Sequence, residues 1–87
     1  MARRSRKEAQ KMIKAMAVLV RNTTWKCGRV ERLVIEYLRT RLRIHGVPKT
    51  SIREMLQHFK LQGKAKSEFF DALKRLEKRR IIRIEGL

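Results

Sequence analysis

Lysines around a glycine form the strongest chemical signal in this sequence. Lys60, Lys64 and Lys66 flank Gly63, just ahead of a predicted helix that starts at Ser67. The first backbone amides of a helix have no partner within it, and together with ammonium groups they can bind one phosphate. We therefore predict an anion contact at this turn, of the kind that a nucleic-acid backbone offers.

Other basic side chains extend this predicted contact along the chain. The first residues carry a run of cations and are expected to form a basic arm, while the last predicted helix carries cations on its outward face. The predicted nucleic-acid-binding residues are Arg3, Arg4, Arg6, Lys7, Lys60, Lys64, Lys66, Ser67, Lys74, Arg75, Lys78 and Arg79. A solvated surface position explains any single lysine equally well, but the set as a whole favours a polyanion.

Two carboxylates lie on the same predicted helix. Glu68 and Asp71 are near its amino-terminal end, the part that would meet base edges if this helix entered a major groove. A carboxylate is repelled by phosphate unless it accepts from a cytosine amine. We expect Glu68 and Asp71 to stabilise the helix dipole in the first turn, so base-specific recognition is not predicted.

No group of residues favours catalysis or a metal. His45 and His58 are 13 residues apart, Cys27 is the single cysteine, and no Cys or His pair has metal-ligand spacing. Glu54 and His58 are four residues apart, a spacing more typical of a helix pair than of a general-base couple. We expect a protein that is not an enzyme and has no cofactor or metal.

The aromatic residues do not indicate a surface for single strands. Trp25 and Tyr37 are too few for a base-stacking platform. Trp25 is expected instead to be a hydrophobic staple at the start of the second helix.

The charge balance points to a polyanionic partner. The 87 residues contain 24 Lys plus Arg and 8 Asp plus Glu, a formal net charge of +16. Such a surface attracts nucleic acid by releasing condensed counterions, and an anionic membrane is the rival partner. The longest apolar run, residues 15–20, is far shorter than the roughly 20 residues of a spanning helix. With one cysteine, which fits a reducing cytosol, we predict a cytoplasmic protein without a membrane partner.

The positioning elements follow from apolar spacing. A chain of 87 residues with 43% hydrophobic content is expected to fold as one compact unit, with a basic arm and helix over 1–24 and a second part over 25–87. The spacing predicts helices over 6–21, from a Thr24 cap to His45, over about ten residues from 51, and over 67–79. Residues 82–85 alternate apolar and charged side chains, which predicts a strand, and the region around Val47 is its expected partner.

The apolar stripe of the predicted helix 6–21 has several potential partners. It can pack on the second helix of the domain, pair with the same helix of another copy, or dock on a larger protein.

The order helix, short strand, short helix, glycine-containing turn, helix, strand resembles that of a winged helix-turn-helix of archaeal type. The segments that carry the resemblance are Val47, Ile52 to Phe59, Gly63, Ser67 to Arg79, and Ile81 to Glu85. The resemblance implies a mostly α (α+β) fold, here with an extra amino-terminal helix and a truncated wing, since no second wing strand follows Gly86 and Leu87. It also implies binding of nucleic acid.

Two shorter segments are similar to the twenty-fifth protein of the small ribosomal subunit of archaea and eukaryotes. They are Trp25-Lys26-Cys27-Gly28-Arg29-Val30 and Lys60-Leu61-Gln62-Gly63. That family is also a winged helix with a basic amino-terminal arm.

We therefore expect a DNA-binding winged-helix protein that contacts mainly the phosphate backbone, either a transcriptional regulator or a chromatin protein, with duplex DNA preferred over RNA. The alternative is a small basic structural subunit of an archaeal ribosome or replicative DNA polymerase complex.

Overall fold

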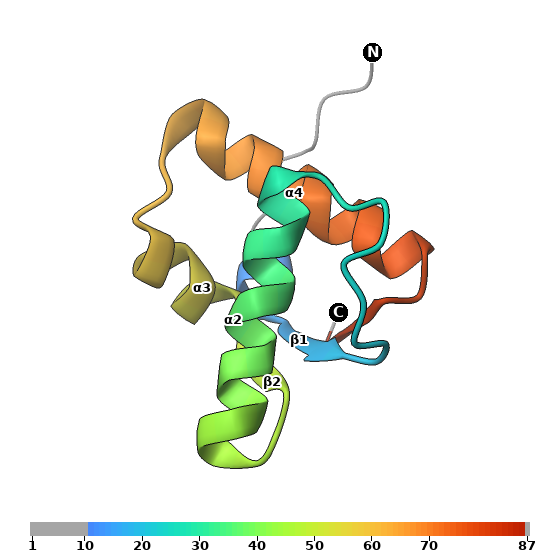
Figure 1. The fold of residues 1–87 in the computed structure, drawn as a ribbon. Coiled ribbons are helices and arrows are strands. Elements are labelled where there is room, and N and C mark those ends of the chain that lie inside the picture. The colour runs from blue at the N-terminus through green and yellow to red at the C-terminus, as the bar shows by residue number, and fades with distance from the viewer. Residues whose placement is uncertain (1–10, 87) are drawn as a thin grey trace.

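A three-stranded antiparallel sheet connects the two ends of the described chain. In the computed structural model, which describes residues 11–86, β1 (Met16–Leu19) lies between β2 (Lys49–Ser51) and β3 (Ile82–Glu85) (Figure 1). Ala17 of β1 is opposite Thr50 of β2 and Ile84 of β3. Both edges of β1 are thus paired, which satisfies its backbone amides and carbonyls.

The predicted helix 6–21 is wrong from residue 15 onward. Residues 11–14 are helical, residue 15 is a bend and Met16–Leu19 form β1, while residues 6–10 lie outside the described part. A short continuous apolar run fits a buried strand as well as a helix, and its length favours the strand. The sheet decides between them, because Ala17 and Leu19 are buried and β2 and β3 pair with β1. A docking helix over 6–21 is therefore excluded.

The predicted pairing of the last strand with the region around Val47 is also wrong. β3 pairs with β1, and β2 begins two residues after Val47, which is itself exposed. The strand prediction for 82–85 is confirmed, but its partner comes from the amino-terminal side of the chain.

The long helix α2 (Arg29–His45) ends as predicted and begins later than predicted. Gly46 has φ 77° and its amide donates to the Leu42 carbonyl at 2.8 Å, a left-handed cap that favours glycine. At the other end the cap is Gly28, whose amide donates to the Glu31 carboxylate at 3.0 Å, and not Thr24.

The two following helices are α3 (Ile52–Phe59) and α4 (Gly63–Lys78). The Ser51 hydroxyl accepts from the Glu54 amide at 3.0 Å, which confirms the predicted cap of α3. α4 begins four residues before Ser67, so the predicted loop around Gly63 is wrong. Gly63 has a φ of 59°, which glycine adopts without steric strain, and this lets the chain turn directly into the helix.

The core lies between these helices and the sheet. Its fully buried side chains include Val34 and Leu38 of α2, Met55 of α3 and Leu73 of α4. The observed mostly helical α+β class agrees with the prediction. No helix within residues 11–86 has the length and apolar character needed to cross a membrane.

Candidate nucleic-acid interface

α4 buries one face and exposes the other. Phe69, Phe70, Leu73 and Leu76 are buried in the core. The exposed residues recur every three or four positions, as expected for one helical face. They include Lys64, Ser67, Glu68, Asp71, Lys74, Arg75 and Lys78. The face therefore carries cations at both ends and carboxylates between them.

The lysines predicted to flank a loop lie mostly within the helix. Lys64 and Lys66 are in the first turn of α4, and Lys60 is the exposed residue that caps α3 with φ 54°. Ser67 lies inside α4, and the helix is preceded by Gln62, whose side chain makes no cap hydrogen bond. The unpaired amides of the first turn are thus those around Gly63, with Lys64 beside them.

The dipole role expected for Glu68 and Asp71 is wrong. The first turn of α4 contains no acidic residue, because the helix starts at Gly63. Glu68 and Asp71 occupy the second and third turns, beyond the part of the helix where the dipole effect is felt. Both carboxylates lie in the middle part of the exposed face of α4.

At the carboxyl end of α4 the structure brings together cations that are far apart in the sequence. Arg75, Lys78 and Arg79 line a pocket of about 350 Å³ with Lys26 from the loop before α2. The only carboxylate among the lining residues described is Glu31. We refer to these five residues as the basic corner.

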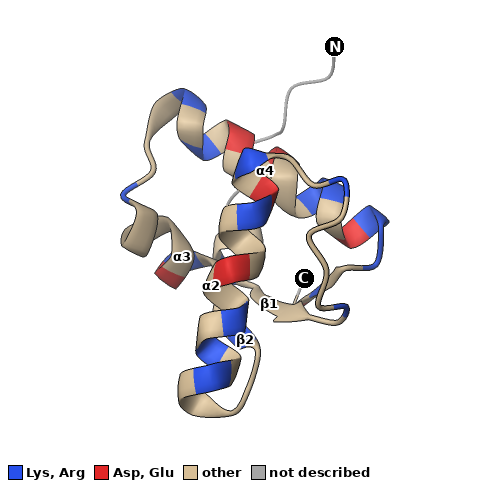
Figure 2. Cartoon of the chain, viewed as in Figure 1, with Lys and Arg blue, Asp and Glu red and all other residues tan. Residues whose placement is uncertain are grey.

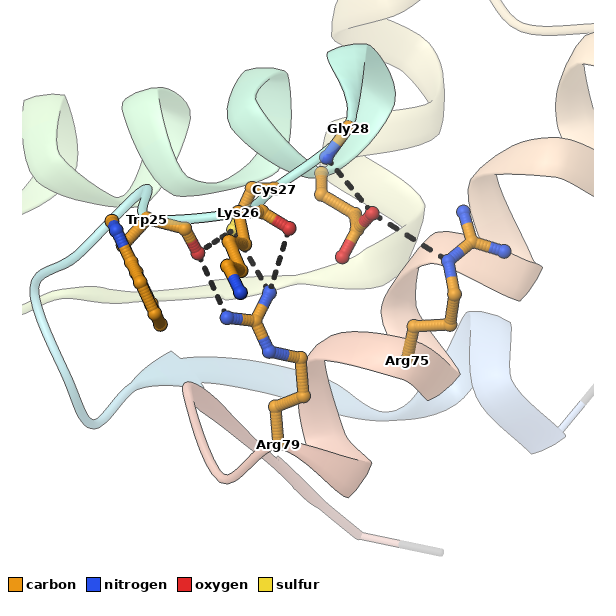
Figure 3. Close-up of polar contacts among 7 residues, drawn as sticks. Trp25, Lys26, Cys27, Gly28, Arg75 and Arg79 are labelled. Carbon is orange, nitrogen blue, oxygen red and sulfur yellow. Dashed lines mark hydrogen bonds and ion pairs between the residues drawn. The ribbon is translucent and has the colours of Figure 1, made fainter.

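The Glu31 carboxylate of the basic corner makes two contacts through one oxygen, Oε1. Glu31 is only 7% exposed, accepts from the Gly28 amide at 3.0 Å, and has Arg75 Nε at 3.5 Å (Figure 3). These contacts hold the start of α2 against α4. They also offset the negative charge that would otherwise oppose an anion in the pocket.

Arg79 is half-buried and braces the loop before α2. Its Nη2 donates to the Trp25 carbonyl at 2.8 Å, and its Nη1 donates to the Lys26 carbonyl at 3.2 Å and approaches Cys27 Sγ at 3.4 Å (Figure 3). The guanidinium of Arg79 is thus directed at the loop, which makes Arg79 a positioning residue more than a ligand-binding one.

The predicted role of Trp25 as a hydrophobic staple is wrong. Its side chain is 68% exposed, so it does not act as a buried staple for α2. Lys26 Nζ lies 4.7 Å from the centre of the indole ring, a cation–π contact (Figure 3). In the sequence, the signal for an exposed ring is the position of Trp25 directly before Lys26 in a polar stretch.

Lys and Arg occur along α2 and α4 and in the loops that follow β1 and α4 (Figure 2). Several of the basic side chains described, including two in strands, are paired with carboxylates: Arg39 with Glu36, Arg41 with Glu54, and Lys49 and Arg83 with Glu85. The hydrogen bond from Lys49 and then that from Arg83 lower the pKa of Glu85. The predicted contacts Arg3, Arg4, Arg6 and Lys7 lie outside the described residues.

Within residues 11–86, no three His, Cys, Asp or Glu side chains come together as metal ligands would. Comparisons of the chain with protein-family models, with curated proteins and with solved structures found no match.

Proposed function

We propose that this protein binds nucleic acid, duplex DNA in preference, through phosphate contacts at the two ends of α4. The observation that carries the proposal is the pattern of charge on the exposed face of that helix. Lys64 and Lys78 mark its ends, in a chain with a net charge of +16. Releasing counterions from phosphates would supply the binding free energy.

The spacing of these cations suits a nucleic-acid strand. Lys64 and Lys78 are 14 residues apart on one helix, which corresponds to about 21 Å at 1.5 Å per residue. Phosphates of duplex DNA rise about 3.4 Å each along the duplex axis, so the two lysines are far enough apart to contact different phosphates. With Glu68 and Asp71 between them, α4 would lie across the backbone instead of entering deeply between base edges.

The proposal includes a winged-helix type of domain. α2, β2, α3, α4 and β3 follow in the order that suggested this resemblance. β1 pairs antiparallel with β3 along all four residues, Met16 to Leu19. In this arrangement β1 would take the place of the second wing strand, so the wing would be built from two distant parts of the chain.

A second candidate is a small basic structural subunit of a larger assembly, such as an archaeal ribosome or replicative polymerase complex. It is favoured by the exposed apolar side chains Ile44 and Val47, 65% and 52% exposed. Ile44 is in the last turn of α2 and Val47 comes two residues after the helix ends. This end of α2 projects beyond the other helices (Figure 1). Large apolar side chains at a projecting end are suited to a protein partner.

Titrations of duplex DNA, single-stranded DNA and structured RNA at low and near-physiological salt test the proposal. The variant Lys64→Ala/Lys78→Ala should weaken duplex binding and reduce the salt slope by about 0.9 for each phosphate that it no longer neutralises. The control is Arg32→Ala/Arg43→Ala, which removes the same charge from exposed positions of α2. Equal effects in the two variants would overturn the assignment of α4, and salt-independent or absent binding would overturn the proposal.

A further inference from the structure

The exposed Trp25 ring has no part in the backbone contacts proposed for α4. Tryptophan is large and apolar and is highly buried on average in folded proteins. Here 68% of its surface is left in solvent, although the next residue but one, Cys27, is buried. The side chain is therefore held outside the core by the loop that carries it.

That loop is tightly bonded. The Trp25 amide donates to Thr23 Oγ1 at 3.1 Å, and the Cys27 amide donates to the Thr24 carbonyl at 3.1 Å. Arg79 bonds the Trp25 carbonyl from the end of α4, at 2.8 Å. A side chain presented on a braced loop loses little conformational entropy when it binds, which is the usual gain from preorganisation.

The surroundings of Trp25 indicate an anionic ligand. Lys26 Nζ lies 4.7 Å from the ring centre, and Lys26 also lines the pocket of about 350 Å³ in the basic corner. Arg75 and Lys78 line the same pocket, and Glu31 is already bonded to Gly28 and Arg75. An aromatic face next to a cluster of cations matches the two parts of a nucleotide, its base and its phosphate.

We propose that Trp25 stacks on an unpaired base of bound nucleic acid, while the phosphate of that strand lies at the basic corner. This inference rests on the proposed function. Inside a duplex both faces of a base are covered by its neighbours, so a ring outside the helix reaches an unpaired base only in a single strand or where a base is extruded from the stack. Because the proposed function already has α4 on a duplex, the ligand expected here is a junction between duplex and single strand.

The alternative ligand of the Trp25 ring is a protein partner, because an exposed tryptophan is also a typical anchor of protein interfaces. The cation beside the ring favours the nucleotide, because Lys26 contacts the ring and also lines the pocket of the basic corner. Lys26, Lys78 and Arg75 surround a pocket in which the one carboxylate among its described lining residues is already bonded.

The test uses Trp25 as its own probe, because it is the only tryptophan in the chain. The full-length protein is titrated with a labelled blunt duplex and with the same duplex bearing a short single-stranded overhang. Anisotropy of the label reports binding, and tryptophan emission reports stacking. The overhang should quench the emission and the blunt duplex should not.

Variants give a second readout. Trp25→Ala should weaken binding of the overhang substrate about 5- to 150-fold, which corresponds to about 1–3 kcal/mol for one stacked base. It should leave the blunt duplex unchanged, and Trp25→Phe should retain most of the affinity. Ile44→Ala is the control, because Ile44 is 65% exposed and distant in sequence from the basic corner.

The outcomes separate the two proposals. No binding of either substrate at low salt would overturn the proposed function and this inference with it. Binding of both substrates without quenching, and with Trp25→Ala equal to the wild type, would overturn this inference alone. Quenching by the overhang together with a selective loss of affinity in Trp25→Ala would establish it.

Discussion

Replacing Arg79 with methionine should release the loop that carries Trp25. Methionine has a similar length and leaves packing largely intact, but it cannot donate. The variant lacks the hydrogen bonds to the Trp25 carbonyl at 2.8 Å and to the Lys26 carbonyl at 3.2 Å, as well as the approach to Cys27 Sγ.

The magnitude follows from these hydrogen bonds. A hydrogen bond to a charged group contributes about 1.5–3 kcal/mol net. Both Arg79 bonds are exposed to solvent, so water replaces part of this contribution, and we take about 1 kcal/mol for each. The free energy of unfolding should fall by about 2 kcal/mol, which lowers Tm by about 8–16 °C in a domain of this size.

The assay is thermal unfolding followed by circular dichroism, with Lys78→Met as the control. Lys78 is the preceding residue and is exposed, and its replacement removes the same charge, so this variant should change stability by no more than about 0.5 kcal/mol. Hydrogen exchange should also speed up at Cys27 and Gly28 only in Arg79→Met. Equal changes in the two variants would refute the bracing role.

Two further predictions concern backbone strain and pH. Gly46→Ala should destabilise the fold by about 1–2 kcal/mol, because Gly46 has a φ of 77° that alanine adopts only with strain. No atom lies within 4 Å of an added Cβ, so the cost is conformational alone. Urea unfolding measures the loss of stability, and an unchanged midpoint would contradict this prediction. Hydrogen bonds from Lys49 and Arg83 lower the pKa of Glu85 in the folded protein. The stabilisation of the fold by the ionised Glu85 is therefore complete above the ordinary glutamate pKa, about 4.3. It is lost as the pH falls through the lower pKa of the folded state. The difference in stability between wild type and Glu85→Gln should therefore be present at neutral pH and vanish in acid, and a pH-independent difference would show that the ion pairs contribute nothing.

Much of the fold was predictable because local signals agreed with one another. α2 has a sustained apolar stripe and a glycine after its last turn, and α3 has a serine cap followed by a matching apolar face. β3 alternates apolar and charged residues. In each case the local propensity and the tertiary environment favour the same conformation, so the sequence pattern was sufficient.

The errors occur where local patterns fit two conformations. The run over residues 15–20 fits a helix and a strand equally in its spacing. A glycine such as Gly63 fits a break between helices as well as the positive φ with which α4 begins. The candidate site likewise could be predicted only in part. The cations of α4 could be named from sequence, but the contribution of Lys26 to the pocket depends on packing α4 against the start of α2.

The sequence by itself determined the charge, the amphipathic helices α2 and α3, and the final strand, because these depend on composition and on contacts between near neighbours. Only the tertiary structure decided that residues 16–19 are the central strand, that Arg79 braces a distant loop and that Trp25 is exposed. Those outcomes depend on interactions between segments that are far apart in the chain, which satisfy backbone groups and buried charges in ways that no local spacing encodes.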